Sequence, residues 1–292
     1  MRIALYAVAV ILAAGVLCAL RIALSNYRGE LSDYKRWPAK EISRHPERTG
    51  IANLHEVVFP ARDGQRLAGW YVPSQNRSAV VLVHGTGADR SSLLAETRIL
   101  AQAGFGALAL DLPGQGASDG ETIWGVPERQ AISAAVDWLT SQADVDPQRI
   151  GGFGLSMGAY VLSQAAVLDT RLRAVTLAAC PNDVVEQNWV SSNKWGLLSQ
   201  LPTYWALRWS GQTLDMLPKN VVGAIAPRAL FILGGTLDEA VPQYMGRQLF
   251  AAAGDPKELW IVPGAGHGDY IHAVPREYPT RLIEFFSRSL LN

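Results

Sequence analysis

The chain has 292 residues, of which 49% are hydrophobic and 18% are charged. This balance is typical of a folded domain with a large core, and it excludes a disordered chain. Basic and acidic residues number 26 each, which gives no support for a general electrostatic attraction to nucleic acid. The two cysteines are too few for a disulfide scaffold or a cysteine-rich metal site.

The chain begins with an apolar segment. Between Arg2 and Arg21 lie eighteen residues without a charge, which as a helix would extend about 27 Å, close to the hydrocarbon core of a bilayer. We therefore expect residues 1–24 to form a single-pass membrane anchor, with the cytoplasmic side favoured by the positive charges that follow. The alternative is a cleaved signal peptide ending at Ala23-Leu24-Ser25, which would make the protein secreted or periplasmic.

A polar stretch over residues 25–50 predicts a linker between this anchor and one catalytic domain over 51–292. The domain opens with two extended runs, at 55–59 and 66–72. A turn at Asp63-Gly64 joins the two runs, which predicts an antiparallel hairpin.

From residue 79 onward, short apolar runs alternate with segments of helical periodicity. Such apolar runs suit strands that are covered on both faces, as in a parallel sheet. Strands are expected at 79–83, 107–110, 149–153, 174–178, 229–233 and 258–262. Helices are expected at 92–103, 127–141, 156–168, 243–252 and 276–290. The alternation predicts an α/β fold with a mostly parallel sheet and helices on both of its faces.

A candidate nucleophile lies between the third of these strands and the helix that follows it. The sequence there is Gly154-Leu155-Ser156-Met157-Gly158, and a strand before it and a helix after it are the setting of a nucleophile elbow. The glycines Gly154 and Gly158 leave room for the chain to turn sharply. The start of the helix would direct amides and a positive dipole end toward a developing oxyanion, so Ser156 is the candidate nucleophile.

A serine hydroxyl needs a base to accept its proton, and the base needs a carboxylate to orient it. His267 stands between glycines after the last predicted strand, at the edge where ligands of open α/β sheets bind. His272 is its competitor. Asp238 follows the preceding strand, with Glu239 and Asp183 as alternatives. The order Ser156, Asp238, His267 is the one expected for this fold class.

The oxyanion formed during such a reaction needs two N–H donors. One is the amide of Met157, directly after the nucleophile. The other is expected from the loop that follows strand 79–83, where Gly85 allows a sharp turn that presents the amide of Thr86. His84, at the end of that strand, is interpreted as a structural brace for the loop.

Together these residues resemble the α/β-hydrolase superfamily, and the resemblance covers nearly all of residues 55–292. The hairpin around Asp63-Gly64 is similar to that of its membrane-tethered, Bem46-like and serine-aminopeptidase-like branch. Residues 111–118 resemble the glycine-rich loop after the next strand. The resemblance implies a triad of Ser156, Asp238 and His267, and it leaves the substrate open because this fold hosts many activities.

About fifty residues separate the strand at 174–178 from the strand at 229–233, and we expect a cap insertion over 182–226. It holds four of the nine tryptophans of the chain. Trp205 and Trp209 are four residues apart, so on a helix they would share one face. They are candidates for an acyl pocket, and the alternative is that they only pack the cap onto the domain.

The sequence thus predicts a membrane-tethered serine hydrolase without a metal or organic cofactor. Its expected substrate is a small-molecule or lipid-like carboxylic ester, or a thioester or amide, cleaved through an acyl-enzyme. Two alternatives stay open. One is a peptidase or amidase of the same fold, and the other is a non-catalytic tethered binding protein on a hydrolase scaffold.

Overall fold

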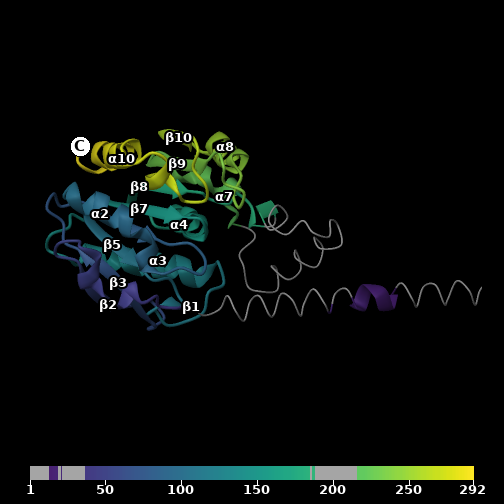
Figure 1. The fold of residues 1–292 in the computed structure, drawn as a ribbon, viewed down its shortest axis with the longest axis horizontal. Coiled ribbons are helices and arrows are strands. Elements are labelled where there is room, and N and C mark those ends of the chain that lie inside the picture. Colours follow the sequence, from purple (N-terminus) through teal and green to yellow (C-terminus); the bar gives the residue numbers. More distant parts are fainter. Residues whose placement is uncertain (1–12, 19–20, 22–36, 185, 188–215) are drawn as a thin grey trace, which may run out of the picture.

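The computed structural model describes residues 13–18, 21, 37–184, 186–187 and 216–292. Its centre is an eight-stranded sheet with the strand order β10-β9-β8-β7-β4-β5-β3-β2 (Figure 1). The strands are β2 (His55–Pro60), β3 (Arg66–Val72), β4 (Ala79–Val83), β5 (Gly106–Leu110), β7 (Ile150–Leu155), β8 (Leu172–Ala178), β9 (Ala229–Gly235) and β10 (Lys257–Val262).

The hairpin of β2 and β3 is antiparallel, and β3 also pairs antiparallel with β5. The remaining neighbours in the sheet pair in parallel. The predicted leading hairpin and mostly parallel sheet are therefore confirmed. The predicted strand at 174–178 begins two residues earlier, at Leu172, because a polar Arg173 interrupts its apolar run without ending the pairing.

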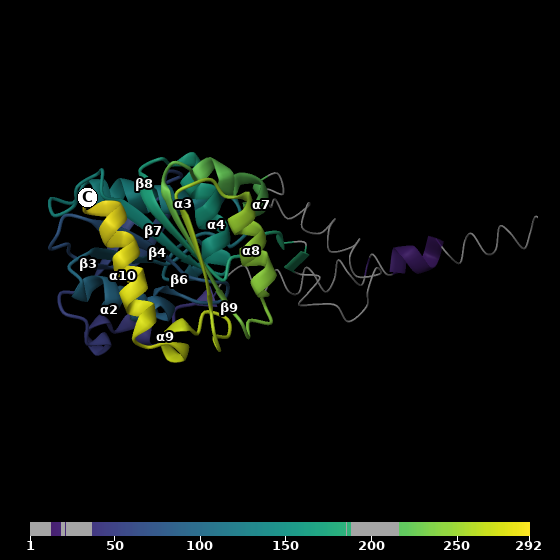
Figure 2. The same cartoon turned by 90° about the horizontal axis from the view of Figure 1, so that it is seen from above.

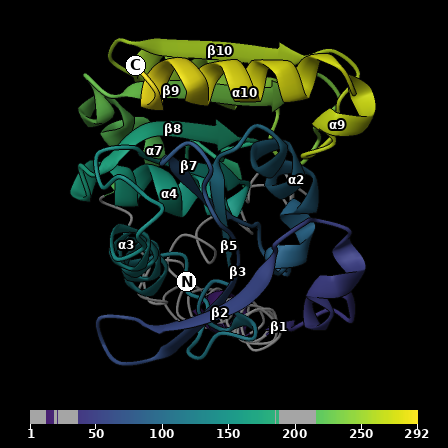
Figure 3. The same ribbon diagram turned by 90° about the vertical axis from the view of Figure 1, so that its left-hand side faces the viewer.

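Helices cover both faces of the sheet. On one face lie α3 (Val126–Thr140), α4 (Met157–Leu168) and α8 (Gln243–Ala252), and on the other lie α2 (Leu94–Gln102) and α10 (Glu277–Leu290). Figure 3 shows α2 and α3 on opposite sides of the central strands. Figure 2 shows α10 near α2, with which it shares one face of the sheet.

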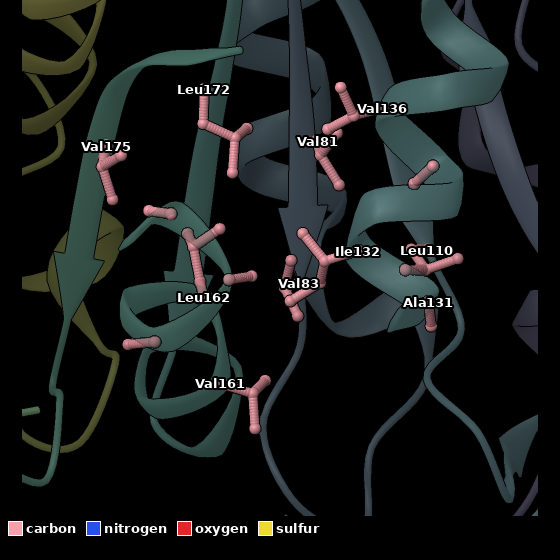
Figure 4. Packing of buried hydrophobic residues seen from close by; sticks show 14 of the residues in the cluster. Val81, Val83, Leu110, Ala131, Ile132, Val136, Val161, Leu162, Leu172 and Val175 are labelled. Atoms are coloured by element: carbon pink, nitrogen blue, oxygen red, sulfur yellow. The ribbon is translucent and has the colours of Figure 1, made fainter. Parts of the chain in front are cut away.

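The central strand β4 explains this arrangement. All five of its residues are buried, because side chains that alternate along a strand fill the cores on both faces. Val81 and Val83 pack with Ile132 of α3 in one core (Figure 4), whereas Val80 and Leu82 belong to the core under α2 and α10. A strand covered in this way must be apolar throughout, as its sequence indicated.

The second half of the predicted linker is packed onto the domain. From residue 37, a short strand β1 (Trp37–Pro38) pairs with β6 (Gln115–Gly116), and two 3-10 turns follow, at Ile42–Arg44 and Pro46–Thr49. Ser43 and Thr49 are buried. The polar composition of this stretch predicted a linker, but its residues form hydrogen bonds with the domain.

Two other predictions fall largely outside the described residues, namely the anchor over 1–24 and the tryptophans Trp205 and Trp209 of the cap. In the parts of the chain that the structure does describe, no helix has the length and apolar character needed to cross a bilayer.

Candidate active site

Ser156 lies at the turn between β7 and α4. Its backbone has φ 55° and ψ −119°, a conformation that residues with a side chain rarely adopt. The Ser156 amide donates a 2.9 Å hydrogen bond to the carbonyl of Ala178, and its carbonyl accepts one of 3.0 Å from the amide of Tyr160. These two bonds hold the serine, half-buried, at the carboxyl edge of the sheet.

The glycines at either side are required because backbone atoms occupy the space of their missing side chains. A Cβ at Gly158 would lie 2.1 Å from the carbonyl oxygen of Val83. A Cβ at Gly154 would lie 2.6 Å from the amide nitrogen of Ala159. The close approach of the start of α4 to β4 at Gly158, and to β7 at Gly154, therefore determines the Gly-x-Ser-x-Gly spacing.

His267 and Asp238 are brought together from the loops after β10 and β9. The Nδ1 atom of His267 lies 2.8 Å from Oδ2 of Asp238. The Asp238 side chain is fully buried, whereas the histidine is 36% exposed. The second carboxylate oxygen accepts hydrogen bonds from the amides of Ala240, at 3.0 Å, and Val241, at 2.8 Å. With Nδ1 engaged, Nε2 is the ring nitrogen left to exchange a proton.

The histidine loop lies against the elbow. A Cβ built at Gly268 would lie 3.0 Å from the side chain of Leu155, the residue before the nucleophile. Gly268 has φ 71°, which favours a residue without a side chain. Gly268 therefore allows the histidine loop to pack closely against Leu155 of the elbow.

The competing residues lie elsewhere or are engaged. His272 is in a short helix α9 (Tyr270–Ala273), is exposed, and pairs through Nδ1 with Asp269 at 2.6 Å. Asp183 accepts a 2.6 Å bond from Nζ of Lys219. Glu239 is exposed to solvent. Among these alternatives, the structure joins none to His267.

The loop after β4 is held by His84, which is fully buried. Its Nδ1 lies 2.8 Å from the carbonyl oxygen of Gly85, and the Leu112 amide donates to its Nε2 at 3.2 Å. These partners require a neutral ring with the proton on Nδ1. Burial, the largest influence, lowers the pKa of His84 and so favours this neutral form.

This brace orients the amide of Thr86. In a trans peptide the carbonyl and the following N–H point in opposite directions, so a Gly85 carbonyl directed at His84 turns the Thr86 N–H away from it. Gly85 itself lies against the nucleophile, because a Cβ there would be 3.3 Å from Cβ of Ser156. The Met157 amide is at the first position of α4, where the helix offers it no acceptor.

The sequence interpretation missed the side chains that support this loop from behind. Asp111 is buried and accepts bonds from the Arg90 amide at 2.7 Å, its guanidinium at 3.1 Å and the Ala117 amide at 2.8 Å. Gln115 accepts a bond from the amide of Gly87. Their place in the glycine-rich loop 111–118 was the available signal. Among the described residues, no three histidine, cysteine, aspartate or glutamate side chains converge as metal ligands.

Comparison with known proteins places this geometry in a family. Residues 34–260 match the X-Pro dipeptidyl-peptidase (S15) family. The chain belongs to this family. This S15-family chain is 33% identical, over 73% of its length and 72% of the relative's, to the uncharacterized protein Rv2307c of Mycobacterium tuberculosis (strain H37Rv). It is also 27% identical to the polyketide transferase ATR5 of Stachybotrys chlorohalonatus, covering 82% of this chain and 99% of that protein.

The fold of the S15-family chain is that of solved α/β hydrolases. It superposes on the esterase Pf2001 of Pyrococcus furiosus with a TM-score of 0.71 at 22% identity, covering 87% of this chain and 98% of the esterase. For the α/β hydrolase GrgF of Penicillium, the TM-score is 0.67 at 23% identity, with 82% and 99% covered. Together with the S15 family match, this fold confirms membership of the α/β-hydrolase superfamily, and the protein is an α/β-fold hydrolase related to the S15 peptidases.

Proposed function

We propose that this protein is a serine hydrolase that cleaves a carboxylic ester through an acyl-enzyme. Ser156 is the nucleophile, His267 the general base and Asp238 the carboxylate that orients it. The observation that carries the proposal is the 2.8 Å contact between His267 Nδ1 and a buried Asp238 carboxylate, beside a serine held on a strained turn. A buried carboxylate in this position keeps the imidazole in one tautomer and stabilises the imidazolium.

The reaction follows from these positions. Ser156 Oγ attacks the ester carbonyl while its proton passes to Nε2 of His267, and the resulting oxyanion accepts hydrogen bonds from the amides of Met157 and Thr86. Collapse breaks the ester bond, and His267 returns the proton to the departing alcohol. A water molecule then gives a proton to His267 and attacks the acyl-enzyme, which releases the carboxylic acid and restores the serine.

The tryptophans of the insertion and the chemistry of the leaving group favour an ester over a peptide with a free N-terminus. Such a peptide carries an ammonium group, which a binding site holds with carboxylates. The insertion over 182–226 includes four tryptophans, and its charges balance: the acidic residues are Asp183, Glu186 and Asp215, and the basic residues are Lys194, Arg208 and Lys219. Asp183 is already paired with Lys219. An alkoxide also leaves with less help from a general acid than an amine does.

The family match favours a second candidate, which is the release of X-Pro dipeptides from a peptide N-terminus. The same serine, histidine and aspartate would carry out that reaction. The two candidates therefore differ in the substrate-binding residues and share the catalytic ones.

Labelling with a fluorophosphonate probe tests the catalytic proposal, and competition then separates the substrates. We expect the wild-type protein to be labelled and Ser156→Ala to be unlabelled. A series of p-nitrophenyl esters should compete with the probe, whereas an Ala-Pro p-nitroanilide should not. Competition by the anilide alone would favour the dipeptidyl-peptidase, and labelling of Ser156→Ala would overturn the mechanism.

We also propose that the apolar segment over residues 1–24 tethers the enzyme to a membrane. The length of its uncharged run supports this proposal. Deleting residues 1–24 should then move the protein to the soluble fraction and leave its turnover of a short ester intact. If the full-length gene instead yields a soluble protein that begins near Asn26, the segment is a cleaved signal peptide.

A further inference from the structure

Gln115 is a second buried side chain, besides His84, that holds the oxyanion loop. It is fully buried in the short strand β6. Its Oε1 accepts a 2.9 Å hydrogen bond from the amide of Gly87, the residue after Thr86. Its own backbone is fixed by bonds to the Leu112 carbonyl and from the Ser118 amide.

These contacts restrain the peptide on each side of Thr86. His84 holds the peptide between residues 85 and 86 through its carbonyl, and Gln115 holds the peptide between residues 86 and 87 through its N–H. Because a peptide unit is planar, fixing both units fixes the two backbone dihedrals of the residue between them. The direction of the Thr86 N–H is therefore set by two buried side chains.

The other end of the Gln115 amide argues against a purely structural role. Its Nε2 is buried and has no hydrogen-bond partner in the structure as described. An unpaired buried amide destabilises a fold, and an apolar side chain of similar shape would avoid that penalty. Gly87 is partly exposed, so its N–H would still find water if the Gln115 acceptor were removed.

The N-terminal segment 37–43 in turn holds both loops that flank the oxyanion hole. Its strand β1 pairs in parallel with β6, in the register Pro38 to Gly116. The Lys40 amide donates to the Asp89 carboxylate at 2.6 Å, and Ser43 Oγ donates to the same oxygen at 2.9 Å. The guanidinium of Arg90 donates to the Ser43 carbonyl at 2.8 Å.

We infer that Gln115 is a positioning residue of the oxyanion hole, and that segment 37–43 keeps it in place. This inference rests on the proposed serine hydrolase function. Stabilisation of an oxyanion depends on donors that are oriented before the reaction, and Gln115 supplies that orientation for Thr86 without touching the substrate. Segment 37–43 then contributes to catalysis indirectly, because it holds the residue that orients the Thr86 amide.

The test compares Gln115→Met, which removes the acceptor and keeps the side-chain length, with Gln102→Met, an exposed control on α2. The measurements are the rate and the final stoichiometry of fluorophosphonate labelling, kcat and KM for p-nitrophenyl acetate, and the melting temperature. For Gln115→Met we expect a labelling rate and a kcat lower by roughly tenfold or more. Stoichiometry, KM and melting temperature should stay near those of the wild type, and the control should match the wild type throughout.

A truncation pair tests the role of the segment. Removing residues 1–36 should leave the labelling rate unchanged, whereas removing 1–43 should slow it as Gln115→Met does. Adding Gln115→Met to the longer truncation should cause little further loss, because both changes act through the orientation of Thr86. If the longer truncation does not fold, Lys40→Pro takes away the N–H that reaches Asp89 and also fixes the backbone of residue 40, and it should slow labelling in the same direction.

The outcomes separate the two proposals. Wild-type rates in Gln115→Met would overturn the inference while the proposed function stood. A lowered stoichiometry at an unchanged rate would show misfolding and would also overturn it. Absence of labelling at Ser156 in the wild-type protein would overturn the proposed function, and the inference with it.

Discussion

At the scale of single residues, backbone groups restrict the orientation of the side chains in the candidate site. Asp238 is an example, because its carboxylate accepts two backbone amides on one oxygen and His267 on the other. Both oxygens of the buried carboxylate thus have hydrogen-bond partners, which offsets the cost of burying a polar group. The histidine can be exposed and still keep its orientation.

Replacing Asp238 by Asn should separate orientation from packing. Asparagine Oδ1 can still accept the amides of Ala240 and Val241, so the fold should persist. Its Nδ2 is a donor, however, and would hold His267 in the tautomer with the proton on Nε2, which cannot act as base. We expect kcat to fall by about 10³–10⁴-fold with the melting temperature little changed. A loss below tenfold in steady-state ester hydrolysis would contradict this role.

Two glycine substitutions should have opposite effects on stability. Gly158→Ala places a Cβ 2.1 Å from the Val83 carbonyl, so it should destabilise the fold by about 3 kcal/mol or more, or prevent folding. Gly246→Ala in α8 meets only ordinary contacts at 3.7 Å and beyond, and it should stabilise the helix by about 0.5–1 kcal/mol. Urea unfolding measures both, and equal midpoints for the two variants would argue against this description of the elbow.

At the scale of elements, one buried hydrogen bond joins α2 to α10. Tyr278 donates to Glu96 at 2.8 Å, and both side chains are buried. Burial, outweighing this hydrogen bond, raises the pKa of Glu96. The folded protein therefore holds this proton more tightly than the unfolded chain does, and stability should fall as the pH rises from the ordinary glutamate range toward the raised value.

Glu96→Gln should remove this dependence while it keeps an acceptor for Tyr278. We expect the variant to unfold at a higher urea concentration than the wild type at pH 8, with the difference shrinking toward pH 4. Glu284→Gln, an exposed change on α10, is the control and should follow the wild type at each pH. A wild-type midpoint above that of Glu96→Gln at pH 8 would mean that the ionised carboxylate stabilises the fold.

The elements that could be predicted from sequence are those with a strong hydrophobic period. The run at 79–83 is apolar throughout and is β4 at the same residues, and α8 matches its predicted range of 243–252. Residues 37–50 have no such period. Their order comes from partners such as Asp89 and Arg90, 49 and 47 residues further along the chain, which local pattern cannot show.

The same division holds for the candidate site. Ser156, Asp238 and His267 each follow a strand that could be recognised, so topology alone predicts that they meet at one edge. Gln115 lies in a two-residue strand and was not singled out. Its importance depends on a contact with Gly87, 28 residues away in sequence, and only the folded chain shows that contact.

At the scale of the whole molecule, the insertion should determine which esters are accepted. If Trp205 and Trp209 line an acyl pocket, replacing both by Ala should lower kcat/KM more for long acyl chains than for acetate. Each buried CH₂ contributes about 0.8 kcal/mol when its surroundings are apolar, and acetate has too short a chain to gain from it.

A chain-length series on the double variant, measured beside its melting temperature, tests this prediction. Tryptophans that only pack the cap would lower the melting temperature and reduce the activity on all chain lengths by a similar factor. A flat profile with a lower melting temperature would therefore exclude the acyl-pocket role.

The distribution of the site over the sheet also determines when the enzyme becomes active during its synthesis. The proposed base follows β10, the last strand of the sheet, and is 111 residues beyond the nucleophile. A ribosome adding 5–20 residues per second needs roughly 6 to 22 s to cover that distance. Until His267 has left the ribosome, the emerging chain carries an elbow serine without a base, so esters near the site of translation are not cleaved by unfinished enzyme.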